Sequence, residues 1–178
     1  MDVIKEIHER ASLWTFFGFL VPALAVLALM GLLFQAPILT ITGGRPILDV
    51  RPWYSFEEAV QLFNLLGENG RTLYSQQQIL DAVFPILFGT AFSQGIAHVN
   101  NLRGEEDTAW RKLVLLPYLE TFFDYLENLL IATQLMAFPA LSPVVISFAC
   151  IATIAKWVLL ILAAFSFIAS AAKSVSTN

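Results

Sequence analysis

Four long apolar runs restrict what this chain can fold into. A helix needs about 20 apolar residues to cross the roughly 30 Å hydrocarbon core of a bilayer. The runs cover residues 13–34, 79–97 (which can extend back to 71), 113–135 and 144–172. The first run holds no charge and the last holds only Lys156. The sequence therefore predicts an all-α, four-transmembrane-helix bundle, with residues 1–178 forming a single integral membrane domain.

The composition agrees with an outer surface that faces lipid. Hydrophobic residues make up 57% of the chain, charged residues only 13%, and the mean hydropathy is +0.70. A net charge of −4 argues against a nucleic-acid partner, which favours a basic surface. Cys150 is the only cysteine, so no intramolecular disulfide can form and no CxxC motif exists. The lipid bilayer is the expected partner, with protein partners or a homo-oligomer left open, and no cofactor is expected.

The distribution of Lys and Arg predicts the orientation. Six basic residues lie before the first run, between the second and third, or after the fourth: Lys5, Arg10, Arg103, Arg111, Lys112 and Lys173. Three lie on the other side, at Arg45, Arg51 and Arg71. Both termini are therefore expected in the cytoplasm, with the protein in the plasma (inner) membrane. The first run is longer than the apolar part of a signal peptide, which favours a retained helix.

The loop at residues 35–70 is expected on the outer face. Pro37 and the glycines and prolines after it predict extended or turning chain. Ser55 and Glu58 then have the spacing of a capping box, in which each side chain satisfies a free backbone N–H at a helix start. Gly67 can supply the left-handed residue that ends the helix. We therefore expect a short amphipathic helix that lies on the outer membrane face or caps the bundle, and capping is favoured because its polar face is acidic.

The third run carries an acidic stripe. At about 100° per residue, Glu120, Asp124 and Glu127 share one helical face, flanked by Asn128. A charge exposed to lipid at mid-bilayer costs at least about 2.5 kcal/mol, so these side chains are expected to face inward.

The second and fourth runs carry groups that can meet this stripe. At about 1.5 Å per residue, Asp124, Asp81 and Lys156 all come out roughly 15–18 Å deep, near the mid-plane. A salt bridge of Lys156 with Asp124 and Asp81 is therefore predicted. Pro85 lacks an N–H, so it deprives the Asp81 carbonyl of its helical partner and predicts a kink. Further polar residues flank Asp81 on the outer side: Arg71, Tyr74, Gln77 and Gln78.

Two segments, "GRTLYSQQQILDAVFP" (residues 70–85) and "LPYLETFFDYLEN" (residues 116–128), resemble a family of small, uncharacterised four-helix membrane proteins from microbes. The shared pattern is Gly-Arg, Tyr, Asp and Phe-Pro in the first segment, and Leu-Pro, Phe-Asp and Glu-Asn in the second. This resemblance implies the same architecture and no particular activity.

Three roles remain open for the buried acids. They can fix how the helices pair, as buried polar groups often do in bundles. They can form a path for protons, cations or a small solute, because one lysine cannot neutralise four acids. A metal- or cofactor-assisted enzyme is the third role, although His8 and His98 lie far from the acids and no metal ligands or catalytic residues can be assigned. The favoured interpretation is an accessory or structural membrane protein that is not an enzyme, with proton- or cation-coupled transport as the alternative.

Overall fold

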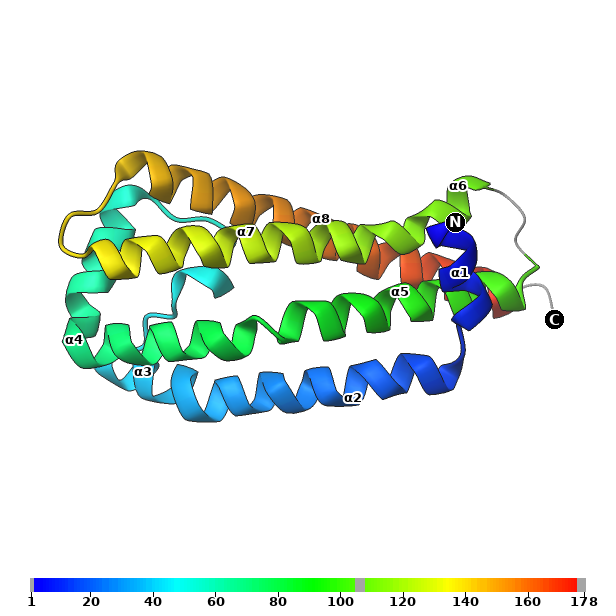
Figure 1. Cartoon of the computed structure of the whole chain (residues 1–178), viewed down its shortest axis with the longest axis horizontal. Helices are drawn as coiled ribbons and strands as arrows, with labels where there is room; N and C mark the ends of the chain where they lie inside the picture. The colour runs from blue at the N-terminus through cyan, green and yellow to red at the C-terminus, as the bar shows by residue number, and fades with distance from the viewer. Residues whose placement is uncertain (1, 105–107, 176–178) are drawn as a thin grey trace.

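The computed structural model describes residues 2–104 and 108–175, and all regular structure within them is helical (Figure 1). The elements are α1 (Val3–Arg10), α2 (Leu13–Met30), the π turn η1 (Gly31–Gln35), α3 (Ala36–Ile41), the 3-10 turn η2 (Leu48–Val50), α4 (Phe56–Asp81), α5 (Phe84–Leu102), α6 (Thr108–Lys112), the 3-10 turn η3 (Leu113–Leu115), α7 (Leu116–Ala137) and α8 (Pro143–Val175).

Three segments in the described residues are long and apolar enough to cross a membrane: Leu13–Ile41, Phe56–Leu102 and Pro143–Ala172. They contain the first, second and fourth predicted spans. The third predicted span, residues 113–135, corresponds to η3 and α7 and is not among the three. It is long enough, but Glu120, Asp124 and Glu127 lower its hydropathy.

The first helical segment is longer than predicted. It continues through η1 and α3 to Ile41 instead of ending at Phe34, so Pro37 lies in a helix and the prediction of extended chain there was wrong. The physical reason is the π turn, in which the Ala36 N–H bonds to the Gly31 carbonyl. This wider turn lets the chain accommodate a proline, which has no N–H to donate, without leaving the helix.

The predicted capping helix is present as the first half of α4. Ser55 and Glu58 form the reciprocal capping box, with Glu58 Oε2 accepting from the Ser55 N–H at 2.8 Å. Gly67 interrupts α4 with φ 60° and ψ −169°, a conformation that essentially only glycine adopts. A second break separates α4 from α5, where Pro85 lies in the first turn of α5. Pro85 therefore starts a new helix here instead of kinking a continuous one.

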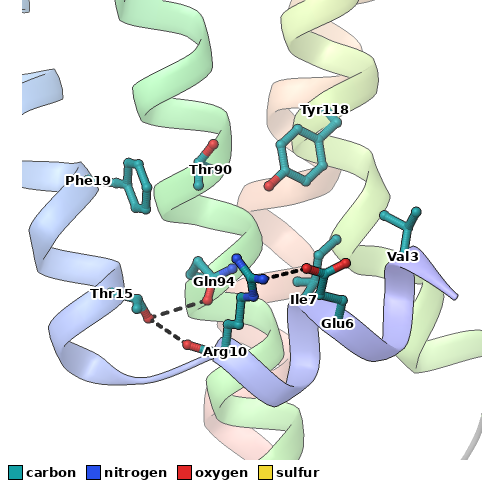
Figure 2. A pocket seen from close by; sticks show the side chains of 9 residues that line it. All are labelled: Val3, Glu6, Ile7, Arg10, Thr15, Phe19, Thr90, Gln94 and Tyr118. Carbon is teal, nitrogen blue, oxygen red and sulfur yellow. Dashed lines mark hydrogen bonds and ion pairs between the residues drawn. The ribbon is translucent and has the colours of Figure 1, made fainter. Parts of the chain in front are cut away.

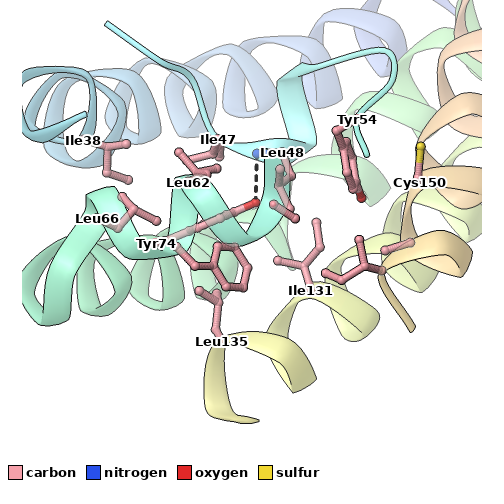
Figure 3. Packing of buried hydrophobic residues seen from close by; sticks show 14 residues of the cluster. Ile38, Ile47, Leu48, Tyr54, Leu62, Leu66, Tyr74, Ile131, Leu135 and Cys150 are labelled. Atoms are coloured by element: carbon pink, nitrogen blue, oxygen red, sulfur yellow. Dashed lines mark hydrogen bonds between the residues drawn. The ribbon is translucent and has the colours of Figure 1, made fainter. Parts of the chain in front are cut away.

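The long helices lie side by side, with α2 packed along α5, α7 along α8, and α5 against both α7 and α8 (Figure 1). One end of the bundle carries α1, α6 and the end of α8, where the His8 ring lies 2.9 Å from Asn101 Oδ1 and 3.2 Å from the Arg111 carbonyl. At the opposite end, the first half of α4 and the loop before it pack against α7 and α8 in the main apolar core (Figure 3). Cys150 is buried in that core.

Candidate functional site

The segment between α3 and α4 folds back between the helices and brings a carboxylate into their centre. Ile47 and Leu48 are fully buried in the core (Figure 3). The Tyr74 hydroxyl holds this segment, since it donates to Asp49 Oδ1 at 2.8 Å and accepts from the Leu48 N–H at 3.2 Å. Burial, followed by repulsion from the Glu127 carboxylate, raises the pKa of Asp49 to about 7. An acid from outside the predicted spans thus joins the acids within them.

Five carboxyl groups form an acidic cluster in the centre of the bundle: Asp49, Asp81, Glu120, Asp124 and Glu127. Lys156 of α8 is the cation of this acidic cluster. Its Nζ pairs with Glu127 Oε2 and lies 3.4 Å from Asp124 Oδ1. The same ammonium donates to the Asp49 backbone carbonyl at 3.1 Å. The pairing of Lys156 with Asp124 is as expected, but the predicted pairing with Asp81 was wrong. Glu127 takes that place because it is one helical turn further along the same face of α7 as Asp124.

Asp81 is instead joined to the cluster through an amide. Asn128 Nδ2 donates to Asp81 Oδ2 at 3.0 Å and lies 3.4 Å from Asp124 Oδ1. Gln78 Nε2 in turn donates to the Asn128 backbone carbonyl at 3.3 Å. One amide thus bridges a carboxylate at the end of α4 to one in the middle of α7.

The cluster has a closed part around Glu127. This side chain is fully buried, and its Oε1 accepts from the Thr153 hydroxyl at 2.6 Å. Thr153 also lies 3.2 Å from the hydroxyl of Tyr54, which is 2% exposed. The ammonium neutralises the Glu127 carboxylate and the hydroxyl hydrogen-bonds it within close-packed protein, as a purely structural ion pair requires.

The cluster also has an open part around Glu120. This residue is only 6% exposed, yet its carboxylate makes no hydrogen bond or ion pair with any described residue. Gln77 is 1% exposed, and its Oε1 likewise has no hydrogen-bond partner. Buried polar groups are normally paired, so unpartnered ones call for an explanation.

The explanation is a cavity of about 350 Å³ that both side chains line. Its polar lining consists of Gln35, Asp49, Gln77, Asp81, Glu120, Asp124 and Lys156. Its remaining lining is mainly apolar or aromatic: Leu27, Met30, Gly31, Val50, Phe84, Phe88, Trp157 and Leu160. The volume is within the range of about 300–1,000 Å³ that ligand pockets occupy.

The structure brings together most of the residues singled out from the sequence. All six of the buried polar set are less than 9% exposed: Asp81, Glu120, Asp124, Glu127, Asn128 and Lys156. Of the flanking set, Tyr74, Gln77 and Gln78 contact the cluster or its cavity. Arg71 does not, because it donates to the Phe63 carbonyl at 2.9 Å and stacks on the Phe138 ring.

Several residues of the acidic cluster and its cavity could not be singled out from the sequence. Asp49 belongs to the loop at residues 35–70 that we expect on the outer face; its apolar neighbour Leu48 is fully buried, whereas Val50 on its other side is 45% exposed. Tyr54 and Thr153 carry no charge and so did not stand out from their surroundings. Trp157 also lines the cavity, with an indole Nε1 that has no hydrogen-bond partner.

A second cavity, of about 520 Å³, lies at the end of the bundle near α1 (Figure 2). Its two charged side chains are paired with each other. Arg10 lies 2.6 Å from Glu6, and the Thr15 hydroxyl donates to Gln94 Oε1 at 3.3 Å. No charge is left over for a ligand, so this cavity is the weaker candidate.

Comparison with protein-family models, curated proteins and solved structures finds no match for this chain. Among the described residues, no three His, Cys, Asp or Glu side chains are arranged to hold a metal ion. The acidic cluster and its cavity are therefore the features of this chain that bear on its function.

Proposed function

We propose that this chain is a four-crossing membrane protein whose central cavity binds a small cationic solute, as a carrier or a receptor. The architecture is supported by α7, which packs along both α8 and α5. Its acids face inward, while Leu119, Phe122 and Leu129 are 48%, 59% and 63% exposed. A helix with an apolar outer face and a charged inner one is suited to lie in lipid within a bundle. As a bundle of this kind, the chain is also a candidate member of the uncharacterised four-helix family that its two motifs resemble.

The orientation proposed from the sequence places both termini in the cytoplasm. The helices α1 and α6, which carry Lys5, Arg10 and Arg111, share one end of the bundle, and α3 and the first half of α4 lie at the other (Figure 1). Tags at residue 178, which lies outside the described residues, and within residues 43–46 test this in intact right-side-out cells. The first tag should be protected and the second accessible, and the reverse result would overturn the orientation.

The observation that carries the binding proposal is the unpartnered Glu120 carboxylate in the cavity. Five carboxyl groups (Asp49, Asp81, Glu120, Asp124 and Glu127) surround one ammonium, and Lys156 is committed to Glu127 and Asp124. An ionised carboxylate buried without a partner is costly, so the remaining acids must hold protons or a cation. A site that exchanges one for the other is what a cation-binding carrier needs.

Ligand-dependent stability of the purified protein tests this proposal. A ligand that binds only the folded state raises the unfolding midpoint in detergent. We expect at least one member of a panel of Na⁺, K⁺ and primary alkyl- and arylalkylammonium ions to stabilise the wild type and not Glu120→Gln. Glu57→Gln, at an exposed carboxylate of α4, is the matched control and should respond like the wild type. Equal responses of wild type and Glu120→Gln to every ion would refute the proposal.

A structural or accessory role is the second candidate, and the closed part around Glu127 favours it. That ion pair holds α7 against α8 and requires no ligand. It does not account for Glu120, because a carboxylate with no protein partner contributes nothing to helix pairing. The Glu120→Gln variant separates the two roles by its response to ligand: a binding site loses its stabilisation by the ion, whereas a purely structural cluster gives no ion-dependent stabilisation in the wild type or in the variant.

A further inference from the structure

We infer that the solute is a primary or secondary ammonium ion on a compact apolar or aromatic body, because the Glu120 cavity joins unpartnered acceptors to an aromatic wall. This inference rests on the proposed function and identifies the class of ligand.

The polar side of the cavity favours a cation that carries N–H groups. Glu120 supplies a carboxylate with no protein partner, Gln77 supplies a free amide oxygen, and Asp49 Oδ2 is a third buried acceptor without a partner. Charge alone would accept any cation, but buried acceptors left without donors cost binding energy. An ammonium with N–H bonds can donate to the Glu120 carboxylate in the cavity, whereas a quaternary ammonium cannot donate to any of these acceptors.

The other side of the cavity favours an apolar body. Phe84 and Phe88 of α5 stack with their ring centroids 5.3 Å apart, and both line the cavity. Leu27 and Met30 of α2 and Leu160 of α8 complete this wall. A hydrated metal ion would leave these side chains facing water, whereas a hydrocarbon body would bury them, and aromatic faces also attract a nearby ammonium.

The size of the cavity limits that body. At about 30 Å³ per water-sized group, 350 Å³ holds roughly a dozen non-hydrogen atoms. Phenethylammonium, with about nine, fits within this limit, and a long-chain lipid amine does not.

The cavity is closed toward both ends of the bundle, so we infer that a ligand enters it from the side, between α2 and α8. The folded-back segment at Leu48 and Asp49 closes one end, where Tyr74 holds it. Toward the other end, Phe16 of α2 stacks on Phe167 of α8 with the centroids 6.0 Å apart. Between these closures, the cavity wall includes Leu27, a side chain that is 46% exposed. A ligand that enters there comes from the lipid phase, which again favours an apolar body.

The test compares apparent Kd values, from the shift of the unfolding midpoint, for four probes on the full-length protein in detergent. Phenethylammonium should bind at least about tenfold more tightly than methylammonium, since each buried methylene strengthens binding about fourfold. Phenethyltrimethylammonium, which has no N–H, and neutral phenethyl alcohol should each bind at least about tenfold more weakly than phenethylammonium.

A cavity-filling variant locates the site. Gly31 lines the cavity, and a Cβ added there meets no atom within 4 Å, so Gly31→Leu should fold and lose phenethylammonium binding. Gly18→Leu, in α2 of the same Leu13–Ile41 segment and equally open, is the matched control and should bind normally. If methylammonium or Na⁺ binds as tightly as phenethylammonium, with Glu120 still required, the inference about the ligand fails while the proposed function stands. If no ion distinguishes wild type from Glu120→Gln, both fail. Binding of phenethylammonium that survives Gly31→Leu would place the site elsewhere and also overturn the inference.

Discussion

Replacement of Lys156 by Met should destabilise the bundle more than any other single loss of charge in the acidic cluster. Lys156 is 8% exposed and Glu127 is fully buried, so the substitution leaves a carboxylate inside the protein with only the Thr153 hydroxyl to stabilise it. Breaking a buried ion pair by removing one partner typically costs about 3–5 kcal/mol. The Asp49 carbonyl also loses its donor, at a further cost of about 1–3 kcal/mol.

The partner of Lys156 is identified by a double-mutant cycle. Glu127→Gln alone should cost less than Lys156→Met, because Lys156 keeps Asp124 and the new amide oxygen can still accept from Thr153. With both substitutions, the loss should be smaller than the sum of the two single losses by about 1–3 kcal/mol, as for residues in direct contact. The free energies come from reversible unfolding in mixed micelles, followed by helical circular dichroism.

Asp81→Asn provides the comparison cycle. Asp81 is bonded to Asn128 and is not paired with Lys156, so its coupling to Lys156→Met should be clearly smaller than that of Glu127. Additive losses for Lys156→Met and Glu127→Gln would show that the two residues do not interact. A coupling for Asp81 equal to or larger than that for Glu127 would refute the arrangement of the ion pair.

Three further substitutions test the elements that build the site, each by the free energy of unfolding. Tyr74→Phe should cost about 1–3 kcal/mol, because a buried Asp49 oxygen and the Leu48 N–H lose their partner; no loss would show that the segment is not held this way. Gly67→Ala should cost about 1–3 kcal/mol, because its φ of 60° and ψ of −169° suit only glycine, whereas Gly18→Ala in a regular exposed helix should not destabilise. Gly89→Ala should cost about 1–3 kcal/mol, since the new Cβ would overlap the Thr121 hydroxyl of α7, and an unchanged stability would show that α5 and α7 are further apart.

The parts of the fold that depend on local chemistry could be predicted from the sequence. The capping box at Ser55 and the break at Gly67 follow from side chains that act on their own backbone within a few residues. The helical spacing that put Glu120, Asp124 and Glu127 on one face is likewise a local property, and all three are buried. These predictions needed no knowledge of which helices are neighbours.

The parts that depend on contacts between distant segments could not be predicted. The depth estimate favoured Asp81 over Glu127 as a partner for Lys156, but depth says nothing about the rotation of a helix about its axis. The position of Asp49 follows from tertiary contacts with Tyr74 and Lys156, which lie 25 and 107 residues away in the sequence. The π turn before Pro37 has no recognised sequence signal, so a proline there was read as the end of a helix.

The division of the acidic cluster into two parts explains why one chain can combine a stable core with a binding site. Lys156, Glu127 and Thr153 satisfy one another in close-packed protein, so this part fixes α7 against α8 whether or not a ligand is bound. Glu120 lies two turns away on the same face of α7, where the cavity replaces protein contacts. A ligand that pairs with Glu120 therefore need not break the Lys156 ion pair, and binding need not compete with folding.

This separation predicts that Glu120→Gln and Lys156→Met affect different properties. Glu120→Gln should abolish stabilisation by ligand with little change in the stability of the free protein. Lys156→Met should lower the stability of the free protein while ligand still raises the unfolding midpoint. If both substitutions changed both properties to the same extent, the cluster would act as one unit and the separation would be wrong.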